Sequence, residues 1–212
     1  MALRLGDKVP DFTQASTKGE INFYEWAGNS WVMLFSYPTD FMPVCTTELG
    51  RVAQIKPEFE KRNVKVLGLS IDELDDHEMW IEDINEIENT TLNYPILADV
   101  DQKVSTLYDV FHPNANGTFP IRSVFIIDPE KKLRLMFAYP PYTGRNFDEI
   151  LRVIDSLQIV DNYRVSTPAD WKEGGDCVIL NWSQSSQELK KTFPKGYREI
   201  KEYLLITPQP NK

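Results

Sequence analysis

The sequence alternates apolar runs typical of buried strands with segments typical of amphipathic helices. Residues 31–37 (WVMLFSY) form an almost unbroken apolar run that ends at Pro38, which indicates a central strand. From Cys45 onward, apolar residues recur every three or four positions, as they do on one face of a helix. A second strand-like run (64–71) and a second helical segment (74–87) follow. This alternation predicts an α/β fold.

The second half of the chain adds a hairpin and one more helix. Two apolar runs, 121–127 and 133–139, are separated by the turn signal DPEKK. Apolar positions between 147 and 157 predict a helix with one buried face. Further on, glycines, serines and prolines divide the chain into short pieces. We therefore predict an α/β domain over residues 1–165 and a small C-terminal module over residues 166–212.

Charge and hydropathy exclude several classes of function. The chain carries 23 Lys and Arg against 32 Asp and Glu, a net charge of −9, whereas binding a nucleic-acid backbone requires clustered basic residues. No apolar run has the length of a membrane span, and charged residues among the first ten positions do not fit a signal peptide. We expect a cytoplasmic protein with no nucleic-acid or membrane partner.

The two cysteines suggest single-thiol chemistry. Cys45 and Cys177 lie far apart and form no C-x-x-C pair, so local spacing provides neither a dithiol nor a zinc site, and we expect no metal and no cofactor. Cys45 falls in the predicted first turn of a helix, where free backbone N–H groups and the helix dipole lower the pKa of a thiol. The alternative is an inert cysteine buried at a helix start.

Arg122 is the second unusual residue, because it interrupts the apolar run 121–127. A guanidinium buried in such a strand needs an anionic partner, for which the Cys45 thiolate and Glu48 are candidates. The alternative is an arginine on an exposed strand face, with its stem packed on apolar neighbours. The residues alone do not decide whether Cys45 is reactive or inert, or whether Arg122 is buried or exposed.

Several motifs resemble the peroxiredoxins, and the resemblance covers nearly the whole chain. The active-site pattern of that family is P-x-x-x-T-x-x-C, and Pro38 and Cys45 stand at its ends. Four further segments resemble the one-cysteine, peroxiredoxin-6-like subfamily: PVCTTELG (43–50), FEKRNVK (59–65), TGRNFDEILRV (143–153) and TPQP (207–210). Cyanobacterial members of that subfamily look the most similar.

This resemblance implies a thioredoxin-like fold and a homodimeric thiol peroxidase that reduces hydrogen peroxide and alkyl hydroperoxides. The Cys45 thiolate would attack the peroxide and become a sulfenic acid. The resemblance implies that Pro38 shields the site, that Arg122 stabilises the developing charge and that Glu48 holds Arg122. The residues expected to meet the peroxide are Met42, Val44, Arg122, Arg145 and Tyr37.

The subclass follows from a missing cysteine. Two-cysteine members carry a resolving cysteine ahead of a Trp-Lys pair, and the corresponding segment here is STPADWK (166–172). Thr167 cannot form a disulfide, and Cys177, ten residues later, is expected to be structural. The resemblance therefore implies that an external thiol, from the glutathione or thioredoxin system, reduces the sulfenic acid.

The chain also departs from the family's pattern. Met42 replaces the motif threonine, and a thioether cannot donate the hydrogen bond that the hydroxyl gives to peroxide and thiolate. Tyr37 stands where one-cysteine members usually have a histidine. The two histidines, His77 and His112, do not match that position, and we expect both to be solvated. The alternative to a peroxidase is therefore an attenuated peroxiredoxin that acts as a chaperone or redox sensor.

A phospholipase activity, which some animal relatives are credited with, is not expected. The corresponding segment, GNSWV (28–32), lacks the last glycine of the G-x-S-x-G pattern. Tyr24 stands where the partner histidine would be, and Ser30 without a base would not be activated as a nucleophile.

Overall fold

The computed structural model describes residues 3–180 and 185–212, and the chain divides into two compact units, Met1–Phe147 and Asp148–Lys212. The composition change predicted a boundary near residue 165 instead. The long helix α6 (Phe147–Asn162) goes with the second unit because Ile159, near its C-terminal end, packs in the same core as Val165 and Trp171.

A five-stranded sheet in the order β5-β4-β3-β6-β7 organises the first unit. The central strand β3 (Trp31–Ser36) is parallel to β4 (Val64–Ser70) and antiparallel to β6 (Arg122–Ile127). The edge strands are β5 (Ile96–Ala98) and β7 (Leu133–Tyr139), and the predicted β6–β7 hairpin is confirmed. Every residue of β3 is buried, which explains its unbroken apolar sequence.

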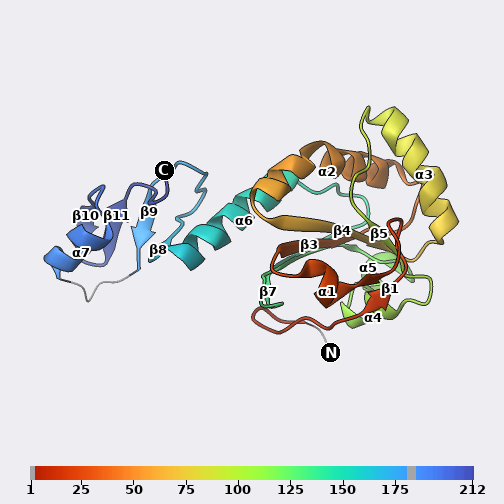
Figure 1. The fold of residues 1–212 in the computed structure, drawn as a ribbon, viewed down its shortest axis with the longest axis horizontal. Helices are drawn as coiled ribbons and strands as arrows, with labels where there is room; N and C mark the ends of the chain where they lie inside the picture. The colour runs from red at the N-terminus through yellow and green to blue at the C-terminus, as the bar shows by residue number, and fades with distance from the viewer. Residues whose placement is uncertain (1–2, 181–184) are drawn as a thin grey trace. The chain divides into compact units, whose positions relative to one another are not determined.

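Helices cover both faces of this sheet (Figure 1). The two long helices α2 (Pro43–Lys61) and α3 (Leu74–Ile87) lie on one side, and α1 (Phe23–Ala27) and α4 (Lys103–Leu107) lie on the other. Because side chains alternate along a strand, Val32 and Leu34 of β3 pack in the core beneath α1 and α4. The remaining elements of this unit are the ribbon β1 (Thr13–Gln14) and β2 (Ile21–Asn22), and the short helix α5 (Pro113–Asn116).

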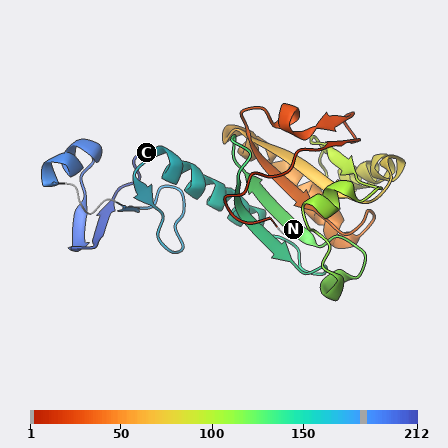
Figure 2. The same cartoon turned by 90° about the horizontal axis from the view of Figure 1, so that it is seen from below.

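The second unit has its own core and its own sheet, and the sheet is drawn in blue in Figure 2. Its strands are β8 (Val165–Ser166), β9 (Cys177–Ile179), β10 (Arg198–Lys201) and β11 (Leu204–Thr207), antiparallel in the order β10-β11-β9-β8. Helix α7 (Ser186–Thr192) contributes Leu189 to the core that also holds Cys177. Among the described residues, no helix combines the length and the apolar character needed to cross a membrane.

Candidate active site

Cys45 lies in the first turn of α2, as its position after the central strand predicted. Pro43 occupies the start of the helix, where a residue without an N–H group is well tolerated, and Met42 is the N-cap. The Met42 side chain makes no capping hydrogen bond. The exposed fraction of Cys45 is 0 %, so solvent does not reach the thiol.

Arg122 places its guanidinium directly against the thiol. Its Nη1 lies 3.2 Å from Cys45 Sγ and donates to Glu48 Oε2 at 2.8 Å, while its Nε donates to the Pro141 carbonyl at 2.7 Å. The arginine is fully buried, so the alternative of an exposed strand position is wrong. Arg122 begins β6, which runs antiparallel to β3, and this pairing brings it to the end of β3 from which the loop to Cys45 departs.

Glu48 joins two arginines. It lies one helical turn after Cys45 and accepts hydrogen bonds from Arg145 Nε at 2.9 Å, from Arg145 Nη2 at 2.6 Å and from the Arg145 backbone N–H at 2.7 Å. Arg145 Nη1 donates to the carbonyls of Ser36 and Ser123. Arg145, which the resemblance placed among the peroxide contacts, therefore has its guanidinium bonded to Glu48 and to backbone carbonyls.

Burial and nearby charges together shift the pKa values of Glu48 and Cys45. Burial alone would raise the pKa of Glu48, but the charge and hydrogen bonds of Arg145, with a further contribution from Arg122, hold it below its usual range. Burial also raises the pKa of the Cys45 thiol, and the charge and hydrogen bond of Arg122 only partly oppose this. Burial and the charge of Arg122 thus act on the Cys45 pKa in opposite directions, and burial is the larger of the two effects.

One donor of Arg122 has no protein partner. Within the part of the chain that the structure describes, the buried Nη2 of Arg122 makes no hydrogen bond. A buried donor without a partner costs free energy, typically about 1–3 kcal/mol, unless a ligand or water accepts from it. This nitrogen belongs to the same guanidinium that contacts the Cys45 sulfur, so an acceptor bound to it lies next to the thiol.

The other predicted residues lie in the loop between β3 and α2 or, for Val44, in the first turn of α2. Pro38 is buried, and Met42 and Val44 are partly exposed. Tyr37 is buried, and its hydroxyl donates to Asp40 Oδ1 at 2.9 Å; burial, with a smaller contribution from Asp40, raises its pKa well above the usual value. Tyr37 is thus bonded to the loop rather than to the thiol.

His77 is the residue that sequence reasoning placed wrongly. We expected it to be solvated, but its exposed fraction is 0 %, with Nδ1 2.6 Å from Asp40 Oδ2 and Nε2 3.2 Å from the Leu97 carbonyl oxygen. A signal was present, because the spacing of His77, Trp80 and Ile84 puts the histidine on the same helical face as two buried apolar residues.

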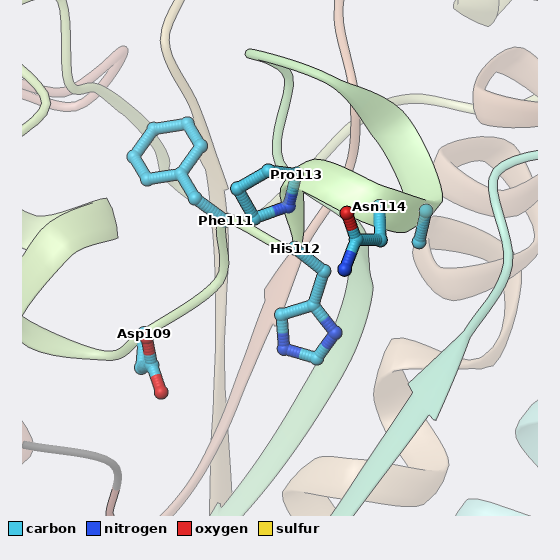
Figure 3. Close-up of a pocket in the computed structure, with 6 residues that line it drawn as sticks. Asp109, Phe111, His112, Pro113 and Asn114 are labelled. Carbon is cyan, nitrogen blue, oxygen red and sulfur yellow. The ribbon is translucent and has the colours of Figure 1, made fainter.

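His112 is exposed, as expected. It lies with Asp109, Phe111, Pro113 and Asn114 around an open hollow at the start of α5, and its imidazole lies apart from the Asp109 carboxylate (Figure 3). Over residues 3–180 and 185–212, no group of three or more His, Cys, Asp or Glu side chains is arranged to hold a metal ion.

Ser30 is the serine of the segment GNSWV, which lacks the last glycine of the G-x-S-x-G pattern. Its Oγ donates a hydrogen bond to Asn63 Oδ1 at 2.9 Å.

Comparison with known proteins assigns the family. Residues 5–136 match the model of the AhpC/TSA family, and over 210 residues the chain is 55 % identical to the 1-Cys peroxiredoxin of Dictyostelium discoideum, covering 99 % of this chain and 87 % of that protein. The chain belongs to the 1-Cys peroxiredoxins. As a peroxiredoxin it is a thiol peroxidase, and the predicted enzyme class is confirmed.

Two solved peroxiredoxin structures are similar to this one. A mutant of peroxiredoxin 6 from Arenicola marina superposes with a TM-score of 0.92 at 43 % identity and covers both chains completely. The yeast mitochondrial 1-Cys peroxiredoxin superposes with a TM-score of 0.87 at 46 % identity, over 97 % of this chain and 99 % of that one. The thioredoxin-like peroxiredoxin fold with a small C-terminal module is thereby confirmed. The expected closeness to cyanobacterial members stays a prediction.

Proposed function

We propose that Cys45 is the residue that this peroxiredoxin oxidises during turnover. The observation that carries the proposal is the contact between the Cys45 sulfur and Arg122, whose second terminal nitrogen is buried without a protein partner. The same guanidinium can therefore stabilise the thiolate through Nη1 and offer a hydrogen bond to a peroxide oxygen through Nη2.

The reaction requires charge stabilisation at two atoms. The Cys45 thiolate attacks one peroxide oxygen, the S–O bond forms and the O–O bond breaks with its electron pair leaving on the other oxygen. That oxygen takes up a proton and departs as water or alcohol, while the sulfur, oxidised by two electrons, becomes a sulfenic acid. Donors already held in place need no reorganisation during this step, which is the advantage of an arginine fixed by Glu48.

An external thiol completes the cycle. Cys177 is buried in the core of the C-terminal module, so we propose that it has a structural role. The structural study of the yeast 1-Cys peroxiredoxin addresses resolution by glutathione and thioredoxin systems, and we propose the same class of reductant here. One thiol attacks the sulfenic sulfur and releases water, and a second thiol exchanges with the mixed disulfide to restore Cys45.

Fewer residues contact the peroxide in this proposal than the sequence analysis expected. We propose that the peroxide meets Arg122, Met42 and Val44, because Met42 and Val44 lie just before Cys45 in the sequence and are partly exposed. Arg145 acts through Glu48, and Tyr37 acts through the loop residue Asp40. The alternative of an attenuated peroxiredoxin that acts as a chaperone or redox sensor finds no support among the relatives reported above, which are named as peroxiredoxins.

A second copy of the chain is the expected partner. Strand β7 is an edge strand whose backbone pairs with β6 on one side, and it exposes Met136 and Ala138. An exposed strand edge with apolar side chains favours pairing with another strand, so we propose a homodimer formed through β7. Introducing a charge through Met136→Lys should shift the protein from dimer to monomer in sedimentation, whereas an unchanged mass would exclude this edge.

We also propose a cytoplasmic location. Both cysteines are free, which suits a reducing compartment. The yeast relative is mitochondrial, so cell fractionation with markers for both compartments is the deciding measurement.

The experiment that tests the enzyme uses one equivalent of hydrogen peroxide. Reduced Cys177→Ser protein, which retains a single thiol, is mixed with peroxide, and sulfenic acid at Cys45 is trapped and counted by mass spectrometry. We expect oxidation at least about a hundredfold faster than that of free cysteine, the size of effect that one well-placed donor provides. Oxidation no faster than free cysteine would exclude the proposal.

A further inference from the structure

Met42 is an oxidisable side chain at the place where the peroxide is proposed to bind. Among the described methionines, Met33 is buried in β3, whereas Met79 and Met136 are exposed. Met42 is partly exposed and comes directly before α2. Oxidation converts the apolar thioether of a methionine into a polar sulfoxide. Met42 is therefore a candidate for modification by the substrate of the enzyme itself.

The position of Met42 at the helix start relates its side chain to Cys45. Its backbone carbonyl accepts from the Thr46 N–H at 2.9 Å and from the Thr46 hydroxyl at 3.1 Å, which identifies it as the N-cap. Pro43, Val44 and Cys45 are then the first three helical residues. An N-cap side chain that carries an oxygen accepts from the N–H of the second or third helical residue. For Met42, the third helical residue is Cys45 itself.

The N–H groups of Val44 and Cys45 have no acceptor in the part of the chain that the structure describes. Pro43 has no N–H group to satisfy. Met42 provides no acceptor, because a thioether sulfur accepts only weakly and this one makes no capping hydrogen bond. Arg122, whose Nη1 contacts the Cys45 sulfur, adds a further unpartnered donor through its buried Nη2. The surroundings of Cys45 thus offer hydrogen-bond donors and lack an acceptor.

Oxidation of Met42 provides this acceptor. The thioether sulfur attacks one oxygen of a hydroperoxide, the S–O bond forms, and the O–O bond breaks with its electron pair on the other oxygen. The proton of the transferred oxygen passes to the leaving oxygen, which departs as water or alcohol. The sulfur is oxidised by two electrons and the peroxide is reduced by two. The new oxygen accepts hydrogen bonds and has no hydrogen to donate.

We propose that Met42 is a modification site at which excess peroxide lowers the activity of the enzyme, because its sulfoxide oxygen accepts from the Cys45 N–H and caps α2. The proposal rests on the proposed function, in which Cys45 is oxidised and the peroxide binds beside Met42. The sulfoxide withdraws a donor from the site, and its partial negative charge disfavours a thiolate nearby. Methionine sulfoxide reductases reverse the modification.

The first experiment identifies the methionine that is oxidised. Protein with Cys45→Ser and Cys177→Ser has no thiol to consume peroxide. It is treated with excess hydrogen peroxide, and the sulfoxide at each methionine is followed by peptide mass spectrometry. Met79, whose exposed fraction is 56 %, is the internal reference. We expect Met42 to be oxidised at least about tenfold faster than Met79, and Arg122→Gln to remove most of this difference, because the bound peroxide loses a donor.

The second experiment measures the effect on Cys45 in a Cys177→Ser background. The protein is exposed to excess peroxide and its thiol is reduced again with dithiothreitol. The rate of sulfenic acid formation is then compared before and after treatment with methionine sulfoxide reductases. We expect a loss of at least about fivefold that these reductases reverse, whereas they do not reverse oxidation of Cys45 to a sulfinic acid. Met42→Leu should show no reversible loss, and Met79→Leu, the matched control, should behave like the parent protein.

The proposal is overturned if Met42 is oxidised no faster than Met79. It is also overturned if the sulfoxide forms at Met42 but its reduction leaves the rate at Cys45 unchanged, or if Met42→Leu shows the same reversible loss as the parent protein. The proposed function is decided separately, because it depends on how fast Cys45 reacts in protein that has not been exposed to excess peroxide.

Discussion

Arg122 Nη1 lies 3.2 Å from Cys45 Sγ, although 77 positions separate the two residues and solvent reaches neither side chain. In such a site the charge of the guanidinium is screened far less than it would be in water. The thiol is therefore subject to two large opposing effects, burial that disfavours the thiolate and a positive charge that favours it. Several measurable consequences come from this balance.

Replacing Arg122 should raise the pKa of Cys45 further, because the group that lowers it is removed while burial remains. For Arg122→Gln we expect the pH profile of Cys45 alkylation to move to higher pH and the peroxide rate at neutral pH to fall by roughly 10²–10³. Arg198→Gln, at an exposed position in the C-terminal module, is the control. An alkylation profile identical to that of the parent protein would contradict the assigned role.

Glu48 should make the protein less stable in acid. Its pKa is lowered in the folded state, so its contribution is fully present above the usual glutamate pKa and is lost as the pH falls through the folded-state value. We expect the free energy of unfolding to decrease as the pH drops below about 4.

The Glu48→Gln variant isolates this effect. It should lose about 3–5 kcal/mol at pH 7, the cost of leaving buried guanidinium groups without a carboxylate, and its stability should vary less with pH in the acid range. Chemical denaturation across pH measures both quantities. Glu173→Gln, which removes only an exposed ion pair with Lys212, serves as the control. Equal acid dependence in parent and Glu48→Gln would show that another group is responsible.

Met42→Thr should change stability and rate separately. Met42 is the N-cap of α2 and makes no capping hydrogen bond, so threonine should stabilise the protein by about 1 kcal/mol. If its hydroxyl also reaches the peroxide, the rate should rise by up to roughly 100-fold. Met42→Val has the shape of threonine without the hydroxyl and should give neither gain. Stopped-flow peroxide consumption of all three proteins decides whether methionine attenuates the enzyme, and equal rates would show that the pocket has compensated.

Cys177→Ala should leave peroxide reduction unchanged, since Cys177 belongs to the core of the C-terminal module. The free energy of unfolding should decrease by about 1 kcal/mol, because an apolar contact is lost. Mass spectrometry after one equivalent of peroxide provides a second readout. A parent protein two mass units lighter, with the thiols joined as a disulfide, would contradict the one-cysteine mechanism.

The catalytic group could be located from the sequence in part. The apolar run of β3 and the helical spacing after Cys45 are local patterns, and they placed the thiol at a strand-to-helix turn before any contact was known. Arg122 was recognisable as unusual because a charge stands in an apolar strand, but its exposure was left open.

The remaining features depend on segments far apart in the chain. Glu48 and Arg145 are separated by 97 positions and His77 and Asp40 by 37, so local periodicity carries no information about these pairings. The placement of His77 was missed because the charged residues around it outweighed its position on the buried face of α3.

By itself, the sequence determined the α/β order of elements, the position of Cys45 at the start of a helix and the absence of a second cysteine at the resolving position. Only the tertiary structure decided that Arg122 and Glu48 meet at the thiol, that burial raises the pKa of Cys45 and that His77 is buried against Asp40. The physical reason is that secondary structure arises from neighbouring residues, whereas burial, ion pairing and pKa depend on what the folded chain brings into contact.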